Sequence, residues 1–152
     1  MKAKDTLVVL LAQGMGIGRV PFAPGTLGTL LGLPLVWWLW QADGLTYVGV
    51  LAAVILIAVG AAGRASAILG KHDDGSIVID EIAGILLALA LVPASFLALI
   101  AGFLLFRFFD IAKPPPIGFI DRRGRGGLGI VLDDLAAGLV TNLILQLVFR
   151  FI

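Results

Sequence analysis

Three charged side chains near the middle of the sequence have the spacing of a single helix face. Arg107, Asp110 and Lys113 are three residues apart, after a long apolar run and directly before three prolines. On a helix this spacing places the guanidinium, the carboxylate and the ammonium about one turn apart on one side. Because proline cannot continue a helix, we expect the helix to end at Lys113. The two cations are candidates to hold a phosphate, although the same pattern fits an ordinary charged helix end at a lipid boundary.

Two acidic pairs occupy similar sequence contexts. Asp80 and Glu81 follow Ile-Val-Ile and precede Ile-Ala-Gly, whereas Asp133 and Asp134 follow Ile-Val-Leu and precede Leu-Ala-Ala-Gly. Each pair is predicted to open an apolar helix, where the helix dipole stabilises carboxylates. Capping explains one acidic residue at each place, so the second, adjacent one indicates a further role.

The clustered acids require a compensating charge, because neighbouring carboxylates repel one another and some protonate unless a cation is present. The chain contains one histidine and no cysteine, so the available ligands are hard oxygens. This set favours Mg²⁺ or Mn²⁺ over zinc or copper. The candidate metal ligands, which are also the candidate catalytic residues, are Asp80, Glu81, Asp110, Asp133 and Asp134.

Two glycine-rich segments offer further phosphate contacts. Between Gly14 and Thr29 the chain is rich in glycine and proline, and a helix is predicted to begin near Thr26. Free backbone amides in such a loop and at a helix N-terminus suit an oxyanion, so Thr26 and Thr29 are candidate substrate-binding residues. A flexible interfacial loop capped by Thr26 is the alternative. The second glycine-rich segment follows Asp121. In it, Arg122 and Arg123 are candidates to bind the phosphate or anionic lipid headgroups.

The polar stretch before the first acidic pair is interpreted as a connecting loop. Asp73 and Asp74 precede Gly75, which is typical of a turn. We interpret His72 as a solvent-facing loop residue and Asp121 as charge balance for the arginines that follow it.

The composition is that of an integral membrane protein. Sixty per cent of the 152 residues are hydrophobic, 14% are charged, and the mean hydropathy is +1.09. Twenty uncharged residues separate Asp43 from Arg64 and 25 separate Glu81 from Arg107, and a transmembrane helix needs roughly 20 apolar residues. The length corresponds to one membrane-embedded domain, residues 1–152. A net charge of +1 excludes a nucleic-acid partner.

The predicted fold class is all-α, a small polytopic membrane helical bundle with its first two membrane helices over 27–40 and 45–63. The run from Ile82 to Phe106 admits two arrangements, a single span kinked at Pro93 or a re-entrant hairpin that turns there. The hairpin places ten of the eleven basic residues on one face, which the positive-inside rule makes cytoplasmic. The hairpin is therefore favoured.

Acidic and basic groups on one face indicate metal-assisted hydrolysis at a phosphate, on a substrate that resides in the membrane. The acids are predicted to open helices at the lipid surface. A transporter would place charged residues near the bilayer midplane, so this location argues against one. A small cation transporter and a lipid-binding scaffold remain the alternatives from other classes.

Four motifs give the sequence a family resemblance. They are Pro24-Gly-Thr-Leu-Gly-Thr29, Asp80-Glu-Ile-Ala-Gly84, Phe106-Arg-Phe-Phe-Asp-Ile-Ala-Lys-Pro-Pro-Pro116 and Gly127-Leu-Gly-Ile-Val-Leu-Asp-Asp-Leu-Ala-Ala-Gly138. On these motifs the chain resembles the phosphatidylglycerophosphatase A family of bacterial membrane lipid phosphatases. The resemblance implies an all-helical inner-membrane enzyme that uses Mg²⁺ to convert phosphatidylglycerophosphate to phosphatidylglycerol and phosphate. It also implies that the acidic residues of the motifs serve the metal and the phosphate.

The residues and the resemblance together give each candidate a role. Asp80, Glu81, Asp133 and Asp134 are expected to hold Mg²⁺, and Asp110 is a further ligand or orients the attacking water. Arg107 and Lys113 are expected to bind the phosphate, assisted by backbone amides between Thr26 and Thr29. An aspartyl-phosphate intermediate and direct attack by water both stay open. A phosphatase or phosphotransferase that acts on another lipid phosphate is the alternative enzyme, and a homodimer also stays open.

Overall fold

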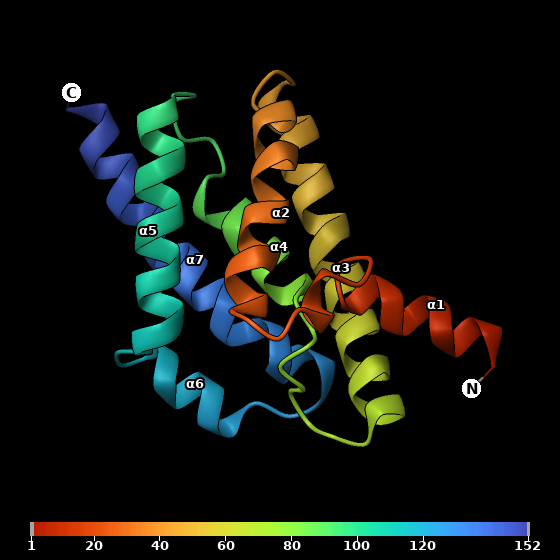
Figure 1. Ribbon diagram of the computed structural model, residues 1–152. Helices are drawn as coiled ribbons and strands as arrows, with labels where there is room; N and C mark the ends of the chain where they lie inside the picture. The colour runs from red at the N-terminus through yellow and green to blue at the C-terminus, as the bar shows by residue number, and fades with distance from the viewer. Residues whose placement is uncertain (1, 152) are drawn as a thin grey trace.

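The computed structural model describes residues 2–151, which form seven α-helices and one short 3₁₀ helix (Figure 1). No strand occurs among these residues, so the predicted all-α fold is confirmed. In chain order the elements are α1 Ala3–Ala12, η1 Ile17–Arg19, α2 Pro24–Leu39, α3 Gly44–Leu69, α4 Ile79–Ala88, α5 Phe96–Ala112, α6 Ile117–Arg123 and α7 Gly126–Arg150.

The short helix α4 forms the centre of the molecule. It packs against α7, α2, α3 and α5, and these helices surround it in Figure 1, whereas α1 projects to one side and α6 lies across the lower end. Ile85, Leu86 and Leu89 of this segment are fully buried. Burying such side chains stabilises the fold by about 1.5–3 kcal/mol each.

A pair of glycines lets α4 and α7 approach to backbone contact. A Cβ atom on Gly138 would lie 2.5 Å from the carbonyl oxygen of Gly84, and one on Gly84 would lie 3.0 Å from the carbonyl oxygen of Asp134. Small residues at a helix crossing allow this close approach. Each glycine follows an acidic residue, Asp80 or Asp134, by four positions, so the crossing fixes where the acids lie.

The apolar run from Ile82 to Phe106 is divided between two helices. α4 ends at Ala88, α5 begins at Phe96, and the two run in opposite directions (Figure 1). Their polar ends therefore meet, and Asp80 and Asp110 line the same pocket. The alternative of one continuous kinked helix is excluded.

The broken end of α4 is stabilised by side chains from three other helices. The last carbonyls of a helix lack partners within it, and irregular backbone at membrane depth is tolerated only where the protein satisfies it. Tyr47 donates to the carbonyl of Leu86 at 2.8 Å, and Trp40 donates to that of Leu89 at 3.1 Å. The amide of Asn142 donates to the carbonyls of Ala88 and Ala90 at 3.1 and 2.8 Å, and the amide of Gln146 donates to Ala90 at 3.2 Å. We refer to these four donors as the carbonyl collar.

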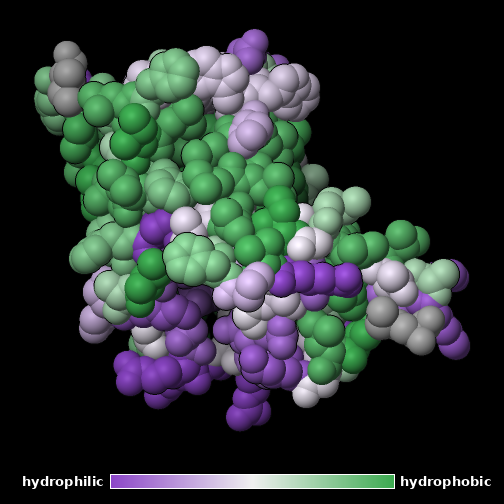
Figure 2. All heavy atoms as spheres, viewed as in Figure 1, coloured by the Kyte–Doolittle hydropathy of each residue, from purple (hydrophilic) through white to green (hydrophobic). Residues whose placement is uncertain are grey.

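The surface is divided into an apolar belt and a polar end. Figure 2 shows hydrophobic residues around the middle and upper part of the molecule and hydrophilic residues gathered at the lower end. Two helices, α3 and α7, are long and apolar enough to cross a membrane, and α2 is apolar but shorter. The predicted helix 27–40 corresponds to α2. The predicted helix 45–63 continues to Leu69 in α3, so Arg64 lies on a helix and not in the loop.

Candidate metal and phosphate site

A polar pocket of about 280 Å³ opens where the N-terminus of α4, the C-terminus of α5 and the first turns of α7 meet the loop before α4. All five acidic residues predicted from the sequence line it. The lining residues are Asp73, Gly75, Ile77, Asp80, Glu81, Asp110, Ile111, Lys113, Asp133 and Asp134.

Three carboxylates form the most compact group in the pocket. One oxygen each from Asp110, Asp133 and Asp134 lies within 4.8 Å of the other two. Asp110 comes from the last turn of α5, and the other two come from α7. Oxygen atoms this close, drawn from two helices, could hold a metal ion such as Mg²⁺, which binds one or two carboxylates and completes its shell with water and phosphate.

The position of the second acidic pair corrects the sequence prediction. Asp133 and Asp134 do not open a helix, because α7 begins at Gly126. Glycine is a poor helix former, but here it is required by packing. A Cβ on Gly127 would collide with the carbonyl oxygen of Val59 in α3. Because α7 packs closely on α3 at these glycines, the glycine-rich run forms the first turns of α7. Asp133 and Asp134 therefore lie about two turns inside the helix.

The first acidic pair lies in the first turn of α4, as predicted. Burial, together with repulsion from Glu81, raises the pKa of Asp80 well above its usual value. The Oε2 atom of Glu81 and the Oδ1 atom of Asp134 are buried without a hydrogen-bond partner. A buried carboxylate is costly unless it is paired or coordinates a metal. Two buried carboxylate oxygens of the pocket are thus left without a protein partner, and the hard-oxygen donors fit a divalent cation.

Arg107 lies between α5 and α2, where it contacts Asp110 of the pocket without lining the pocket itself. Its Nη1 atom is 2.5 Å from an oxygen of Asp110 and 3.5 Å from the hydroxyl of Thr29. The predicted placement of Arg107 and Asp110 on one helix face is confirmed, and their paired side chains are largely buried, with 14% and 12% exposure. The Nε atom of Arg107 is buried without a hydrogen-bond partner.

The start of α2 packs against the same arginine. A Cβ on Gly25 would collide with the carboxylate of Glu81 and would lie 3.3 Å from Nη2 of Arg107. The helix begins at Pro24, and Thr26 is not its cap, because Ala23 holds the N-cap position without a side-chain hydrogen bond. The first-turn amides of α2 are therefore not occupied by a capping side chain. Thr29 is buried, and its hydroxyl donates to the carbonyl of Gly25 at 2.9 Å.

Lys113 has a different place from the one predicted. It caps the end of α5 with a left-handed backbone, φ 45°, so it leaves the helix face that carries Arg107. Its ammonium donates to Asp121 at 2.6 Å and to Asp133 at 2.7 Å. Although burial alone lowers the pKa of Lys113, the hydrogen bonds to these two carboxylates raise it above its usual value. Lys113 lines the pocket and joins α5, α6 and α7.

The two other arginines lie away from the pocket. Arg122 and Arg123 belong to α6, and not to a loop. The Nε of Arg122 donates to the carbonyl of Gly118 at 3.0 Å, and the guanidinium of Arg123 lies 4.1 Å from the centre of the Phe119 ring. Neither arginine lines the pocket.

Asp73 is a pocket residue that the sequence reasoning assigned to a turn. Asp73 does lie in a turn, and the carboxylate of the neighbouring Asp74 accepts hydrogen bonds from the amide and hydroxyl of Ser76 at 2.9 and 2.7 Å. Asp73 has a left-handed backbone, φ 51°, and lines the pocket. The signal available in the sequence was its position seven residues before Asp80. His72 is exposed, as predicted.

The fold and the pocket define a class of protein, a small helical bundle whose apolar belt ends at a carboxylate-lined site. The sequence model for "Phosphatidylglycerophosphatase A" matches residues 10–149. The chain therefore belongs to the phosphatidylglycerophosphatase A family, which consists of phosphoric monoester hydrolases.

Three curated proteins are similar to this chain over most of its length. The phosphatidylglycerophosphatase A of Escherichia coli is 39% identical over 145 residues, covering 91% of this chain and 81% of that protein. The phosphatidylglycerophosphatase A of Haemophilus influenzae is 40% identical over 132 residues, covering 86% and 81%. A putative phosphatidylinositol-3-phosphatase of Bacteroides thetaiotaomicron is 34% identical over 165 residues, covering 100% and 99%. No solved structure gives a significant match.

Proposed function

We propose that this protein hydrolyses the terminal phosphate of phosphatidylglycerophosphate, with Mg²⁺ bound in the acidic pocket. The observation that carries the proposal is the group Asp110, Asp133 and Asp134, with one oxygen of each within 4.8 Å of the others, in a member of this phosphatase family. The unpartnered oxygens of Glu81 and Asp134 support a cation at the same place.

The residues of the pocket divide between metal and phosphate. Asp110, Asp133 and Asp134 would hold the ion, and Asp80 and Glu81 extend the oxygen set towards α2. When bound, Mg²⁺ supplies charge stabilisation to the phosphate oxygens. Beside the acids, the guanidinium of Arg107 and the uncapped first turn of α2 would bind the phosphate and stabilise the charge that develops on it.

Two neighbouring contacts hold these groups in place. Arg107 fixes one oxygen of Asp110 and so sets the direction of the carboxylate. Lys113 binds Asp133, and thereby prevents that side chain from turning out of the pocket. The chemical step is attack on phosphorus either by a carboxylate of the pocket or by water that a carboxylate orients.

The membrane placement follows from the distribution of polar residues. α3 and α7 would cross the bilayer, the hairpin of α4 and α5 would re-enter from the polar end, and the pocket would lie at the headgroup level. By the positive-inside rule this end would be cytoplasmic, in the inner membrane of a bacterium.

The proposal is tested by measuring phosphate release from phosphatidylglycerophosphate in mixed micelles, with the purified protein and defined Mg²⁺. We expect turnover that stops with a chelator and returns with Mg²⁺. Asp134→Asn should lower kcat by about 100-fold or more, while the matched variant Asp5→Asn, at an exposed ion pair with Arg64, should behave as the wild type. Metal-independent turnover, or full activity of Asp134→Asn, would contradict the proposal.

A second substrate belongs in the same assay. Because one relative that aligns over the whole chain is a putative phosphatidylinositol-3-phosphatase, phosphatidylinositol 3-phosphate is the specific alternative. A higher kcat/KM for this lipid than for phosphatidylglycerophosphate would keep the phosphatase chemistry and overturn the proposed substrate.

A further inference from the structure

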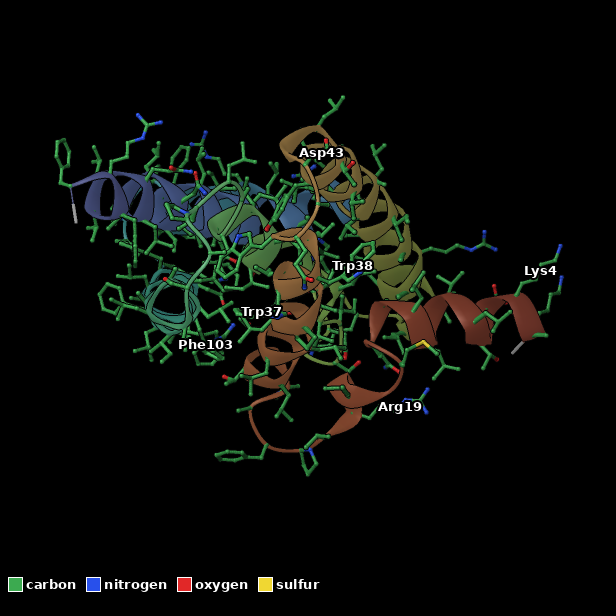
Figure 3. All side chains as sticks on the ribbon, turned by 90° about the horizontal axis from the view of Figure 1, so that it is seen from above. Lys4, Arg19, Trp37, Trp38, Asp43 and Phe103 are labelled. Atoms are coloured by element: carbon green, nitrogen blue, oxygen red, sulfur yellow. The ribbon has the colours of Figure 1, made fainter. Side chains whose placement is uncertain are left out.

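An apolar groove runs along the outside of the molecule between α2 and α5. Its lower part has a volume of about 310 Å³, and a neighbouring cavity of about 400 Å³ continues it towards Trp37. In the view from above, Phe103 and Trp37 lie in the space between the two helices (Figure 3). The residues of the lower part are Leu30, Leu33, Phe96, Leu99, Ile100, Phe103 and Leu104. We call this feature the α2/α5 groove.

The lower end of the groove lies near Arg107, whose guanidinium contacts Asp110 of the acidic pocket. Arg107 of α5 lies 3.5 Å from the hydroxyl of Thr29 in α2. Phe103 precedes Arg107 by four residues, and Leu33 follows Thr29 by four. Residues four apart lie on the same helix face, so the apolar walls of the groove begin one turn beyond the contact between Arg107 and Thr29.

The length of the groove corresponds to one leaflet of a bilayer. At 1.5 Å per residue, the distance along α5 from Arg107 to Phe96 is about 16 Å and that along α2 from Thr29 to Trp37 is about 12 Å. The hydrocarbon core is about 30 Å thick, so one leaflet contributes about 15 Å. A chain that starts at the phosphate site and follows the groove would therefore remain in its own leaflet.

We propose that the α2/α5 groove binds an acyl chain of the phospholipid whose phosphate occupies the pocket. This inference rests on the proposed function and adds a binding site for the apolar part of the substrate. The glycerol backbone would pass the contact between Arg107 and Thr29, and the chain would lie against Leu33, Ile100 and Phe103. Because lipid tails are as apolar as the groove, van der Waals packing of the chain against these side chains supplies the affinity, and a short-chain ester lacks this contact.

A second apolar groove provides a matched control. It has a volume of about 240 Å³, is enclosed by the end of α1, α2, α3 and α4, and includes Leu31 and Ile57. It shares no residue with the α2/α5 groove. Ile57 and Ile100 are the same residue type on outward-facing helix positions, with 50% and 57% exposure. Replacing either by tryptophan fills its groove without disturbing a buried core position.

The experiment compares Ile100→Trp with Ile57→Trp on long-chain phosphatidylglycerophosphate and on a short-chain, water-soluble ester with the same headgroup. Ile100→Trp should lower kcat/KM for the long-chain lipid by roughly tenfold, because the larger side chain occupies the space that the acyl chain would fill. It should leave the short-chain ester unchanged, and Ile57→Trp should affect neither. Equal effects on both esters, or no effect of Ile100→Trp, would overturn the proposal.

A binding readout separates this inference from the catalytic proposal. A lipid phosphate with a photoreactive acyl chain should crosslink to α2 and α5, and an excess of unlabelled lipid phosphate should suppress the crosslink whereas phosphatidylcholine should not. If the lipid crosslinks there but no phosphate is released, the groove stands and the proposed function fails. Crosslinks that phosphatidylcholine suppresses equally would show ordinary lipid contact and refute the specific site.

Discussion

Gly84 and Gly138 meet where α4 crosses α7, so closely that a Cβ on Gly138 would lie 2.5 Å from the Gly84 carbonyl oxygen. Asp80 and Asp134 precede these glycines by four residues each. On both helices the acid therefore lies one turn before the crossing, on the face that carries the glycine. The separation of the two acidic pairs is thus set by how closely two backbones approach.

We expect Gly138→Ala to separate the two helices and weaken the site. The added methyl group meets backbone, which cannot yield as a flexible side chain would, so the cost is about 1–3 kcal/mol of stability. Thermal unfolding in detergent and kcat for phosphate release should both fall. Gly60→Ala in α3 is the control, because nothing lies within 4 Å of its Cβ position, and it should leave both measurements near wild type. A fully active Gly138→Ala protein would contradict this view of the crossing.

Lys113→Met is expected to destabilise the protein by about 1–3 kcal/mol, because it leaves the carboxylate of Asp133 without its cation. Lys113→Arg should restore part of the loss. Since the pKa of Lys113 is raised, its contribution is complete at neutral pH and is lost only in alkaline solution, as the pH rises through the folded-state pKa. Chemical unfolding between neutral and alkaline pH measures this, and an unchanged midpoint in Lys113→Met would refute it.

Asn142→Leu tests the carbonyl collar. The substitution keeps the size of the side chain but removes the donor to the carbonyls of Ala88 and Ala90. A buried carbonyl without a partner costs about 1–3 kcal/mol, so the melting temperature should fall. Leu143→Ala on the exposed side of the same helix should have little effect. If the two variants unfold at the same temperature, the collar does not stabilise the broken end of α4.

The proposed re-entrant hairpin predicts which positions share a side of the bilayer. The native chain has no cysteine, so each introduced cysteine is the single labelling site of its variant. His72→Cys and Arg122→Cys, both at exposed positions, should react with an impermeant maleimide from the same side, and Gln41→Cys should react from the opposite side. Labelling of the first two from opposite sides would rule out the re-entrant arrangement.

Local features of the sequence were sufficient for much of this fold. Pro93 and the apolar pattern marked the break between α4 and α5, and the three prolines marked the end of α5. The predicted start of the last helix, α7, was wrong, because the packing of Gly127 on α3 outweighs the poor helix propensity of glycine. That contact joins segments far apart in the chain and leaves no local signal.

The acidic residues of the site could be predicted from the sequence, but the positions of its basic side chains could be predicted less well. The two acidic pairs lie in similar sequence contexts, and both pairs line the pocket. The direction of Lys113 depends on a left-handed residue after the last turn of α5, which helical spacing cannot reveal. Asp73 was missed for a similar reason. Its turn conformation places it at the pocket, whereas the adjacent Asp74 does not line the pocket.

The central claim is that acids from separate helices hold one divalent cation. Titration of the metal-free protein with Mn²⁺, followed by electron paramagnetic resonance, measures this directly. We predict saturable binding by the wild type that Mg²⁺ displaces, with at least about 10-fold weaker binding in Asp110→Asn and in Asp134→Asn. Binding of equal affinity in the wild type and in both variants would contradict the account.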